Sequence, residues 1–116
     1  MRPFKLTDRE PRAGVRQVAV EGELDLSTAQ ELREALDRAA GYPIVLIDLS
    51  ECEFIDSTGF SIIIHADHAM KQEGRRLALF GATDQAHRAI EIMGLLKMGL
   101  HFDTAEAAEA AAEQKT

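Results

Sequence analysis

The most chemically suggestive residue of the chain is a serine at the predicted start of a helix. Ser57 follows Asp56 and precedes Thr58 and Gly59, a short distance after a run of apolar residues. The free N–H groups and the dipole at a helix N-terminus favour an anion. A phosphate on Ser57 would fit there and would add a charge of about −1.5 to −2. The pattern therefore predicts a serine that phosphorylation can switch.

The same turn has plainer interpretations. Asp56 and Ser57 are both of the residue types that cap helices, and a cap needs no modification. A catalytic serine is disfavoured, because the chain has no Gly-x-Ser-x-Gly elbow and no histidine that the sequence places beside an acid to activate Ser57. On these residues alone, a simple cap is favoured over a phosphorylation site, and both are favoured over a nucleophile.

Acidic and hydroxyl residues also follow an earlier predicted strand. Asp25 and Thr28 would either build a turn and a cap or contact a partner, and the sequence leaves both open. Glu23 is expected to be an exposed acid that can meet a basic residue of a partner. Gly59 is expected to allow close approach of the backbone, and Thr58 to be a secondary cap or a minor acceptor of phosphate.

The chain offers little for a metal or for redox chemistry. His65 and His68 lie close together on a predicted helix, but a zinc site needs a further converging ligand, and no second His-rich segment is evident. A solvated helix face, Asp67 included, is the favoured interpretation. Cys52 lies between two glutamates, which disfavour its thiolate. We therefore predict no metal, no cofactor and no catalytic residue.

Composition narrows the possible partners. The 116 residues suffice for one domain, over 1–116, with a single core. The net charge of −7 argues against nucleic acid or an anionic membrane surface as the main partner. No apolar stretch approaches the 18 residues of a membrane-spanning helix, so no insertion is expected. The single cysteine suits a reducing cytoplasm.

Alternating strand and helix patterns must position these residues. Strands are expected at 4–7, 18–21, 44–49, 77–80 and 100–102. Helices are expected to begin after Ser27 or Thr28, at Ser57, after Thr83 or Asp84 and at about Thr104, with a turn from Pro11 to Gly14. The run 44–49 has almost no polar alternation, which indicates a central parallel strand. The pattern predicts an α/β fold whose first two strands pair antiparallel at one edge.

Several blocks of the sequence together resemble a known family. They are Gly22 to Asp25 followed by Thr28-Ala29, Ile44 to Ser50, Phe54 to Gly59, Gly74 to Leu77, and Ile90 to Leu95. In this order and at this spacing they resemble STAS domains and, more narrowly, bacterial anti-sigma factor antagonists. The resemblance covers nearly the whole chain, and it implies a mixed sheet of four to five strands flanked by about four helices.

The resemblance also implies a mechanism. Ser57 occupies the position of the family's phosphoacceptor, in the Asp-Ser-Ser/Thr-Gly motif. The unphosphorylated protein would bind an anti-sigma factor that has a histidine-kinase-like ATP-binding fold and is also the serine kinase, and so would free a sigma factor. A PPM-type phosphatase would reverse the modification. Such a protein is a monomer or weak dimer and no enzyme. The expected partner-binding residues are Glu23, Asp25, Thr28, Asp56, Thr58, Gly59 and Phe60.

Three rival functions stay open. A STAS subunit of a membrane transporter and a scaffold component of a signalling assembly share the same fold. A nucleotide-binding or hydrolysing domain is the rival from the enzyme class, but no glycine-rich nucleotide loop supports it. The intact Asp56-Ser57-Thr58-Gly59 motif favours the switch. One departure from the family is Phe60, at a position usually held by leucine, and His65 and His68 on the same helix would be able to tune partner choice.

Overall fold

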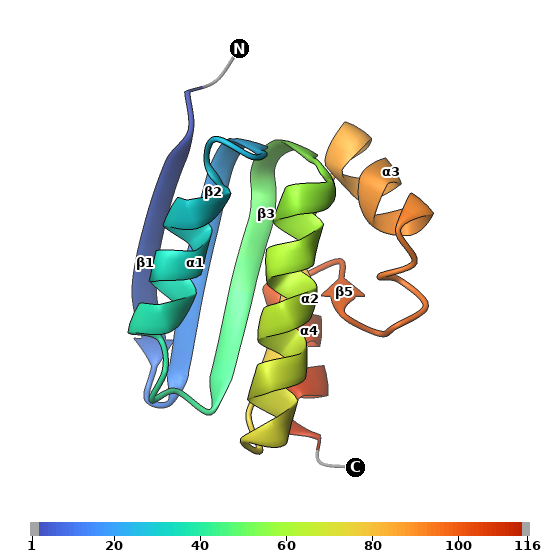
Figure 1. Ribbon diagram of the computed structural model, residues 1–116. Coiled ribbons are helices and arrows are strands. Elements are labelled where there is room, and N and C mark those ends of the chain that lie inside the picture. The colour runs from blue at the N-terminus through green and yellow to red at the C-terminus, as the bar shows by residue number, and fades with distance from the viewer. Residues whose placement is uncertain (1–2, 115–116) are drawn as a thin grey trace.

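A single five-stranded sheet organises the protein (Figure 1). The computed structural model describes residues 3–114. In that part of the chain the strands are β1 (Lys5–Arg12), β2 (Val15–Leu24), β3 (Ile44–Ile55), β4 (Arg76–Phe80) and β5 (His101–Phe102), in that spatial order. The helices are α1 (Ala29–Arg38), α2 (Ser57–Gln72), α3 (Asp84–Ile92) and α4 (Ala105–Glu113). The predicted α/β fold with a mixed sheet is confirmed.

Strand direction follows the connections. β1 and β2 form an antiparallel hairpin at one edge, as predicted, and β2, β3, β4 and β5 run parallel because a helix separates each consecutive pair. Val45, Leu46 and Ile47 near the start of β3 are buried on both faces of the sheet. That burial explains why the run 44–49 lacks polar alternation.

Helices cover both faces of the sheet, but unequally. α1 and α2 lie on one face, and α4 lies behind the sheet in Figure 1. Alternate side chains of β4 point to opposite faces of the sheet. Leu77 and Leu79 belong to the large core beneath α1 and α2. Ala78 and Phe80 belong to a smaller cluster that includes Ala108 of α4. The carboxyl ends of the parallel strands consequently open at one end of the molecule, where α2 begins.

Four strands are longer than predicted, and β1 is the most informative of them. The strand was expected to stop at Thr7 and the chain to turn from Pro11, but β1 continues to Arg12. Proline is tolerated because β1 is an edge strand with no partner on its outer side. The pairing with β2 shifts register between Arg9 and Arg12. Beyond the shift, Arg12 forms ion pairs with Glu109 and Glu113, which connect the edge strand to α4.

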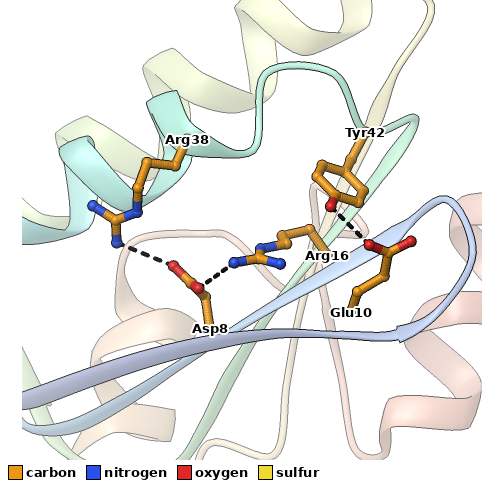
Figure 2. A network of polar contacts seen from close by, with 5 residues as sticks. All are labelled: Asp8, Glu10, Arg16, Arg38 and Tyr42. Carbon is orange, nitrogen blue, oxygen red and sulfur yellow. Dashed lines mark hydrogen bonds and ion pairs between the residues drawn. The ribbon is translucent and has the colours of Figure 1, made fainter.

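A network of polar contacts fastens the same edge strand to the opposite layer (Figure 2). The Asp8 carboxylate on β1 accepts from Arg16 on β2 and, at 3.0 Å, from Nη2 of Arg38 at the end of α1. The Tyr42 hydroxyl donates to Glu10 at 2.8 Å, and the Arg16 guanidinium lies 5.6 Å from the centre of the Tyr42 ring. Local sequence gives no sign of these contacts, because they join residues up to 32 positions apart.

The helix caps differ from the simple expectation. Thr28 is the N-cap of α1, but its side chain makes no capping bond. Thr83 likewise precedes α3 without a side-chain cap. Thr104 does cap α4, since its Oγ1 accepts from the Ala107 N–H at 3.1 Å. Over residues 3–114, no helix has both the length and the apolarity to cross a membrane.

Candidate functional site

The predicted site residues lie where the carboxyl ends of β2 and β3 meet. Leu24, the last residue of β2, is paired with Ile55, the last of β3. The Asp56 N–H extends this pairing by donating to the Leu24 carbonyl at 3.0 Å. The pairing brings the Asp25 turn and the Ser57 turn side by side, although they are 32 residues apart in the chain. The structure thus brings together the two segments, as the resemblance to the family implies.

Asp56 caps the helix that carries the serine. Its Oδ1 accepts from the Gly59 N–H at 3.0 Å, and its carbonyl accepts from the Phe60 N–H at 3.1 Å. Ser57 is the first residue of α2 and its side chain is exposed, while Thr58 is only partly exposed. The prediction that Asp56 or Ser57 caps α2 is confirmed for Asp56. The Ser57 hydroxyl is therefore not the capping group, and it faces solvent at a helix N-terminus.

The next two residues lie in the core. A Cβ built on Gly59 would approach Leu24 Cγ to 2.9 Å and Ile55 Cγ2 to 3.0 Å, so the glycine does permit the close approach expected of it. The Phe60 side chain is 1% exposed. Both residues therefore lie in the core beneath the Ser57 turn and support its position. Any contribution of Gly59 and Phe60 to partner binding would act through the position of the residues above them.

The Asp25 turn is held by its own side chains. The Thr28 Oγ1 accepts from the Asp25 N–H at 2.9 Å and donates to the Glu23 carbonyl at 2.8 Å. The Asp25 carboxylate accepts from the N–H and the hydroxyl of Ser27, at 3.0 and 2.7 Å. The bond from the Ser27 hydroxyl, aided by the Ser27 N–H and Thr28, lowers the pKa of Asp25 below its usual range. The turn role of Asp25 and Thr28 is confirmed, and their contact with a partner stays a prediction.

An acidic groove of about 540 Å³ adjoins these turns. It lies between the ends of β2 and β3 and the start of α3, and it is lined by Glu23, Ser50, Glu51, Cys52, Glu53, Thr83, Asp84 and Gln85. Glu23 was expected to be exposed, but it is half-buried in this groove. Burial, reinforced by the neighbouring glutamates, raises the pKa of the Cys52 thiol to about 11. Cys52 is therefore held as the unreactive thiol.

Two exposed apolar side chains beside the turns were not anticipated. Leu26, next to Asp25, is 78% exposed, and Phe54, three residues before Ser57, is 39% exposed. Phe54 is the register partner of Glu23, which places it at the same edge of the site. A leucine within a polar turn is the signal in the sequence that would have identified Leu26. No comparable signal marks Phe54, because β3 was expected to end before it.

His65 and His68 on α2 are exposed, whereas Asp67 between them is buried. His65 and His68 are exposed on α2, as predicted, and His68 contacts Gln72 at 3.2 Å. Asp67 between them is 4% exposed, so the prediction of a solvated face is wrong for this residue. Nowhere in residues 3–114 do three or more His, Cys, Asp or Glu side chains gather as a metal site requires.

Comparison with known proteins agrees with the motifs. The family model of the STAS domain matches residues 8–108. An anti-sigma-B factor antagonist of Listeria monocytogenes is 36% identical over 80 residues, which cover 67% of this chain and 70% of that protein. The match therefore extends over most of both chains and includes more than the serine motif.

Solved structures agree with the fold. An anti-sigma factor antagonist from Mycobacterium paratuberculosis has a TM-score of 0.79 at 26% identity, covering 97% of this chain and 96% of its own. The unphosphorylated form of the anti-sigma factor antagonist SpoIIAA has a TM-score of 0.76 at 16% identity, covering 98% and 100%. A sulfate transporter family protein of Wolinella succinogenes has a TM-score of 0.73 at 21% identity, covering 90% and 89%. The last two likenesses concern the fold alone.

Proposed function

Because this chain belongs to the STAS domain family, among the anti-sigma factor antagonists, we propose that it is a protein-binding switch controlled by phosphorylation of Ser57. The unphosphorylated chain binds an anti-sigma factor and so releases the sigma factor which that protein holds. Phosphorylation abolishes the binding. The observation that carries the proposal is the exposed Ser57 hydroxyl, on the first turn of a helix that Asp56 already caps.

The proposed contact surface surrounds that hydroxyl. Its polar part consists of Glu23, Asp25, Thr28, Asp56 and Thr58, which the pairing of β2 with β3 brings to one end of the sheet. Its apolar part consists of Leu26 and Phe54. Recognition sites commonly combine exposed apolar anchors with charges that fix orientation. The acids favour a basic partner surface, in keeping with the net charge of −7.

The switch needs no rearrangement of the fold. A phosphate on Ser57 would lie at the positive end of the α2 dipole, so the protein itself tolerates the modification. The same phosphate would stand close to Asp25 and Asp56, adding negative charge to an acidic surface. When a partner docks, the charged phosphate would have to give up its hydrating water at the part of the interface that the serine hydroxyl contacts in the unmodified protein. Repulsion and desolvation together account for release.

The difference in binding free energy that the switch requires is modest. Moving a partner from almost fully bound to almost fully free takes a difference of roughly 5.5 kcal/mol between the two states. Loss of a few charge-assisted contacts, at roughly 1.5–3 kcal/mol each, together with the burial of an unpaired phosphate supplies a difference of this order. SpoIIAA, which shares the fold, is known in a phosphorylated as well as an unphosphorylated form.

The remaining participants follow from the proposed family role. The anti-sigma factor has a histidine-kinase-like ATP-binding fold and serves as the serine kinase, and a PPM-type phosphatase restores the binding form. The chain acts in the cytoplasm as a monomer or weak dimer, and contributes binding, not catalysis. Ser57 is favoured over Thr58 as acceptor because its side chain is the more exposed.

Affinity capture from the native cell extract tests the proposal. The baits are the wild type, Ser57→Ala, Ser57→Asp and Ser61→Asp, with captured proteins identified by mass spectrometry. Ser61 is exposed one turn further along α2, so its aspartate controls for added charge on the same helix. We expect an ATPase-fold kinase on the wild-type, Ser57→Ala and Ser61→Asp baits, and its loss from Ser57→Asp. The kinase, with ATP, should then modify the wild type and not Ser57→Ala.

Three results would replace the proposal. Equal capture of the same proteins by Ser57→Ala and Ser57→Asp would remove Ser57 as the switch, and transporter subunits within that equal set would identify a transporter role. Self-association into a large complex, measured by light scattering, would instead indicate a scaffold component. Saturable nucleotide binding by the isolated chain would indicate the enzyme class.

A further inference from the structure

One buried histidine holds the segment that leads from β4 into α3. The Nε2 atom of His101, on β5, accepts from the Ala82 N–H at 3.1 Å, and both residues are buried. Ala82 lies between the last residue of β4 and the first residue of α3. A buried N–H group that loses its acceptor is costly to the fold. The position of this segment therefore depends on His101 remaining an acceptor.

The helix that follows this segment buries little of its own surface. Figure 1 shows α3 at the margin of the molecule, joined to the rest by irregular segments at both ends. Of its nine residues, Ala86 and Ile90 are the two that are buried. The segment before it begins with two small residues, Gly81 and Ala82, which suits a hinge. A short helix with so little burial opens more readily than the core strands of a fold.

The surroundings of His101 disfavour a proton on its ring. The ring centre of His87, on α3, lies 5.5 Å from that of His101, in an edge-to-face arrangement. His101 pairs with the apolar Leu79 and points to the same face of the sheet, away from α4. Burial, and then His87, lower the pKa of His101, and Asp103 just beyond β5 opposes them. No other charged group of residues 3–114, on α2 or α4 included, acts on this ring.

We propose that the bond from Ala82 to His101 is a proton-operated latch, which holds α3 against the sheet when His101 is neutral and releases it when His101 is protonated. A proton taken from water onto Nε2 turns this acceptor into a donor, so that two N–H groups face one another. Protonation of His87 as well would add repulsion between the two rings. The latch is closed above about pH 6.5, the ordinary histidine pKa, and opens as the pH falls further.

Opening would alter the wall of the acidic groove beside the Ser57 turn. Thr83, Asp84 and Gln85, at the start of α3, line that groove. A partner that contacts this wall binds the closed form better, so acid would weaken its binding in proportion to the fraction of molecules in which α3 is open. This consequence rests on the proposed function, whereas the latch itself does not.

Amide hydrogen exchange of the whole protein, followed by NMR between pH 7.5 and 5, tests the latch. After correction for the intrinsic exchange rates, we expect the amides of Ala82, His87 and Ile90 to lose protection at least threefold. The loss should not exceed about thirtyfold, the limit that a pKa of about 6.5 in the open form sets at pH 5. In urea below the unfolding transition, exchange of these amides should change little, whereas exchange of Leu46 in β3 should accelerate, because local opening exposes little surface.

Variants assign the pH dependence to one ring. His101→Gln retains an acceptor that cannot be protonated, so protection of α3 should no longer change with pH. His65→Gln, at an exposed position of α2, should behave like the wild type. Unchanged protection of α3 in the wild type, the same loss in His101→Gln, or a urea dependence equal to that of Leu46 would overturn the latch. The measurement needs no partner, so a failure of the latch and a failure of the proposed function are read from separate experiments.

Discussion

Gly59 shows how one atom defines the serine turn. The glycine has an ordinary backbone conformation, so its necessity is one of space, because a Cβ would lie 2.9 Å from Leu24 Cγ. Leu24 is fully buried and pairs with Ile55, so it has little freedom to move away. The pairing that places the two turns of the site side by side thus depends on the absence of a side chain at position 59.

The corresponding prediction concerns Gly59→Ala. We expect it to lower the free energy of unfolding by about 1–3 kcal/mol, the usual range for overpacking a core. Urea unfolding followed by circular dichroism measures the change. Gly41→Ala is the matched control, since nothing lies within 4 Å of the added atom, and it should alter stability little. Equal stability of Gly59→Ala and wild type would show that the turn can yield.

His101 predicts a pH dependence near neutrality. Its Nε2 accepts from the Ala82 N–H at 3.1 Å. Burial, and then the nearby His87, lower the pKa of His101 below its usual 6.5. The unfolded chain therefore takes up the proton first as pH falls. The stability contributed by neutral His101 is fully present above about pH 6.5 and is lost as pH falls through the lower pKa of the folded state.

Urea unfolding at pH values from 8 to 5 tests this. We expect the wild type to lose stability below about pH 6.5, and His101→Gln to lose less over the same interval. His65→Gln is the control, since His65 is exposed on α2 and its removal should leave the pH dependence unchanged. An identical pH dependence in His101→Gln and wild type would assign the effect to another group.

At the scale of elements, the attachment of β1 is the least predictable feature. The strand is an edge with mostly exposed residues, and it is fastened by Asp8 to α1 and by Arg12 to α4. Burial alone would raise the pKa of Asp8, but the hydrogen bonds and charges of Arg38 and Arg16 outweigh it and lower that pKa below 3.8. The contribution of Asp8 is therefore present above about pH 3.8 and is lost as pH falls further.

We expect Asp8→Asn to destabilise the protein by about 1 kcal/mol at neutral pH, the size of a partly exposed ion-pair network, and less in high salt. Unfolding in urea at low and high sodium chloride measures both effects. Asp37→Asn, at an exposed position of α1, is the matched control. A loss that does not change with salt would point to packing of Tyr42 and Arg16, not to charge.

The elements themselves were largely predictable, and their exceptions have physical reasons. β3 and the order of strands and helices follow from long apolar runs and helical spacing, which local sequence encodes. The full length of β1 was not predictable, because the tolerance of Pro11 depends on the edge position, a tertiary property. The burial of Asp67 was missed for a related reason, because it depends on how α2 packs in the fold, which the local sequence does not encode.

The site was predictable as far as its motif extends. Ser57, Asp56 and the turn role of Asp25 follow from local chemistry. The burial of Phe60 and the exposure of Leu26 depend on how the Ser57 turn and the Asp25 turn are oriented relative to the sheet. No local sequence pattern predicts that orientation.

At the scale of the whole molecule, charge governs how a partner arrives. The net charge of −7 and the acidic groove beside Ser57 should speed association with a basic partner. We expect the association rate with the captured anti-sigma factor to fall at least tenfold between 50 and 300 mM salt. Biolayer interferometry measures the rate. Glu23→Gln should reduce the rate more than Glu34→Gln, which changes an exposed residue of α1. A rate independent of salt would rule out electrostatic steering.

The serine of the proposed switch begins the longest helix of residues 3–114. α2 runs unbroken from Ser57 to Gln72, about 24 Å along its axis. Its buried residues pack into the core along that length, so a partner at the serine meets a rigid rod and not a pliable loop. Such a surface loses little conformational freedom on binding, which favours affinity and limits the range of partner shapes that it can accept.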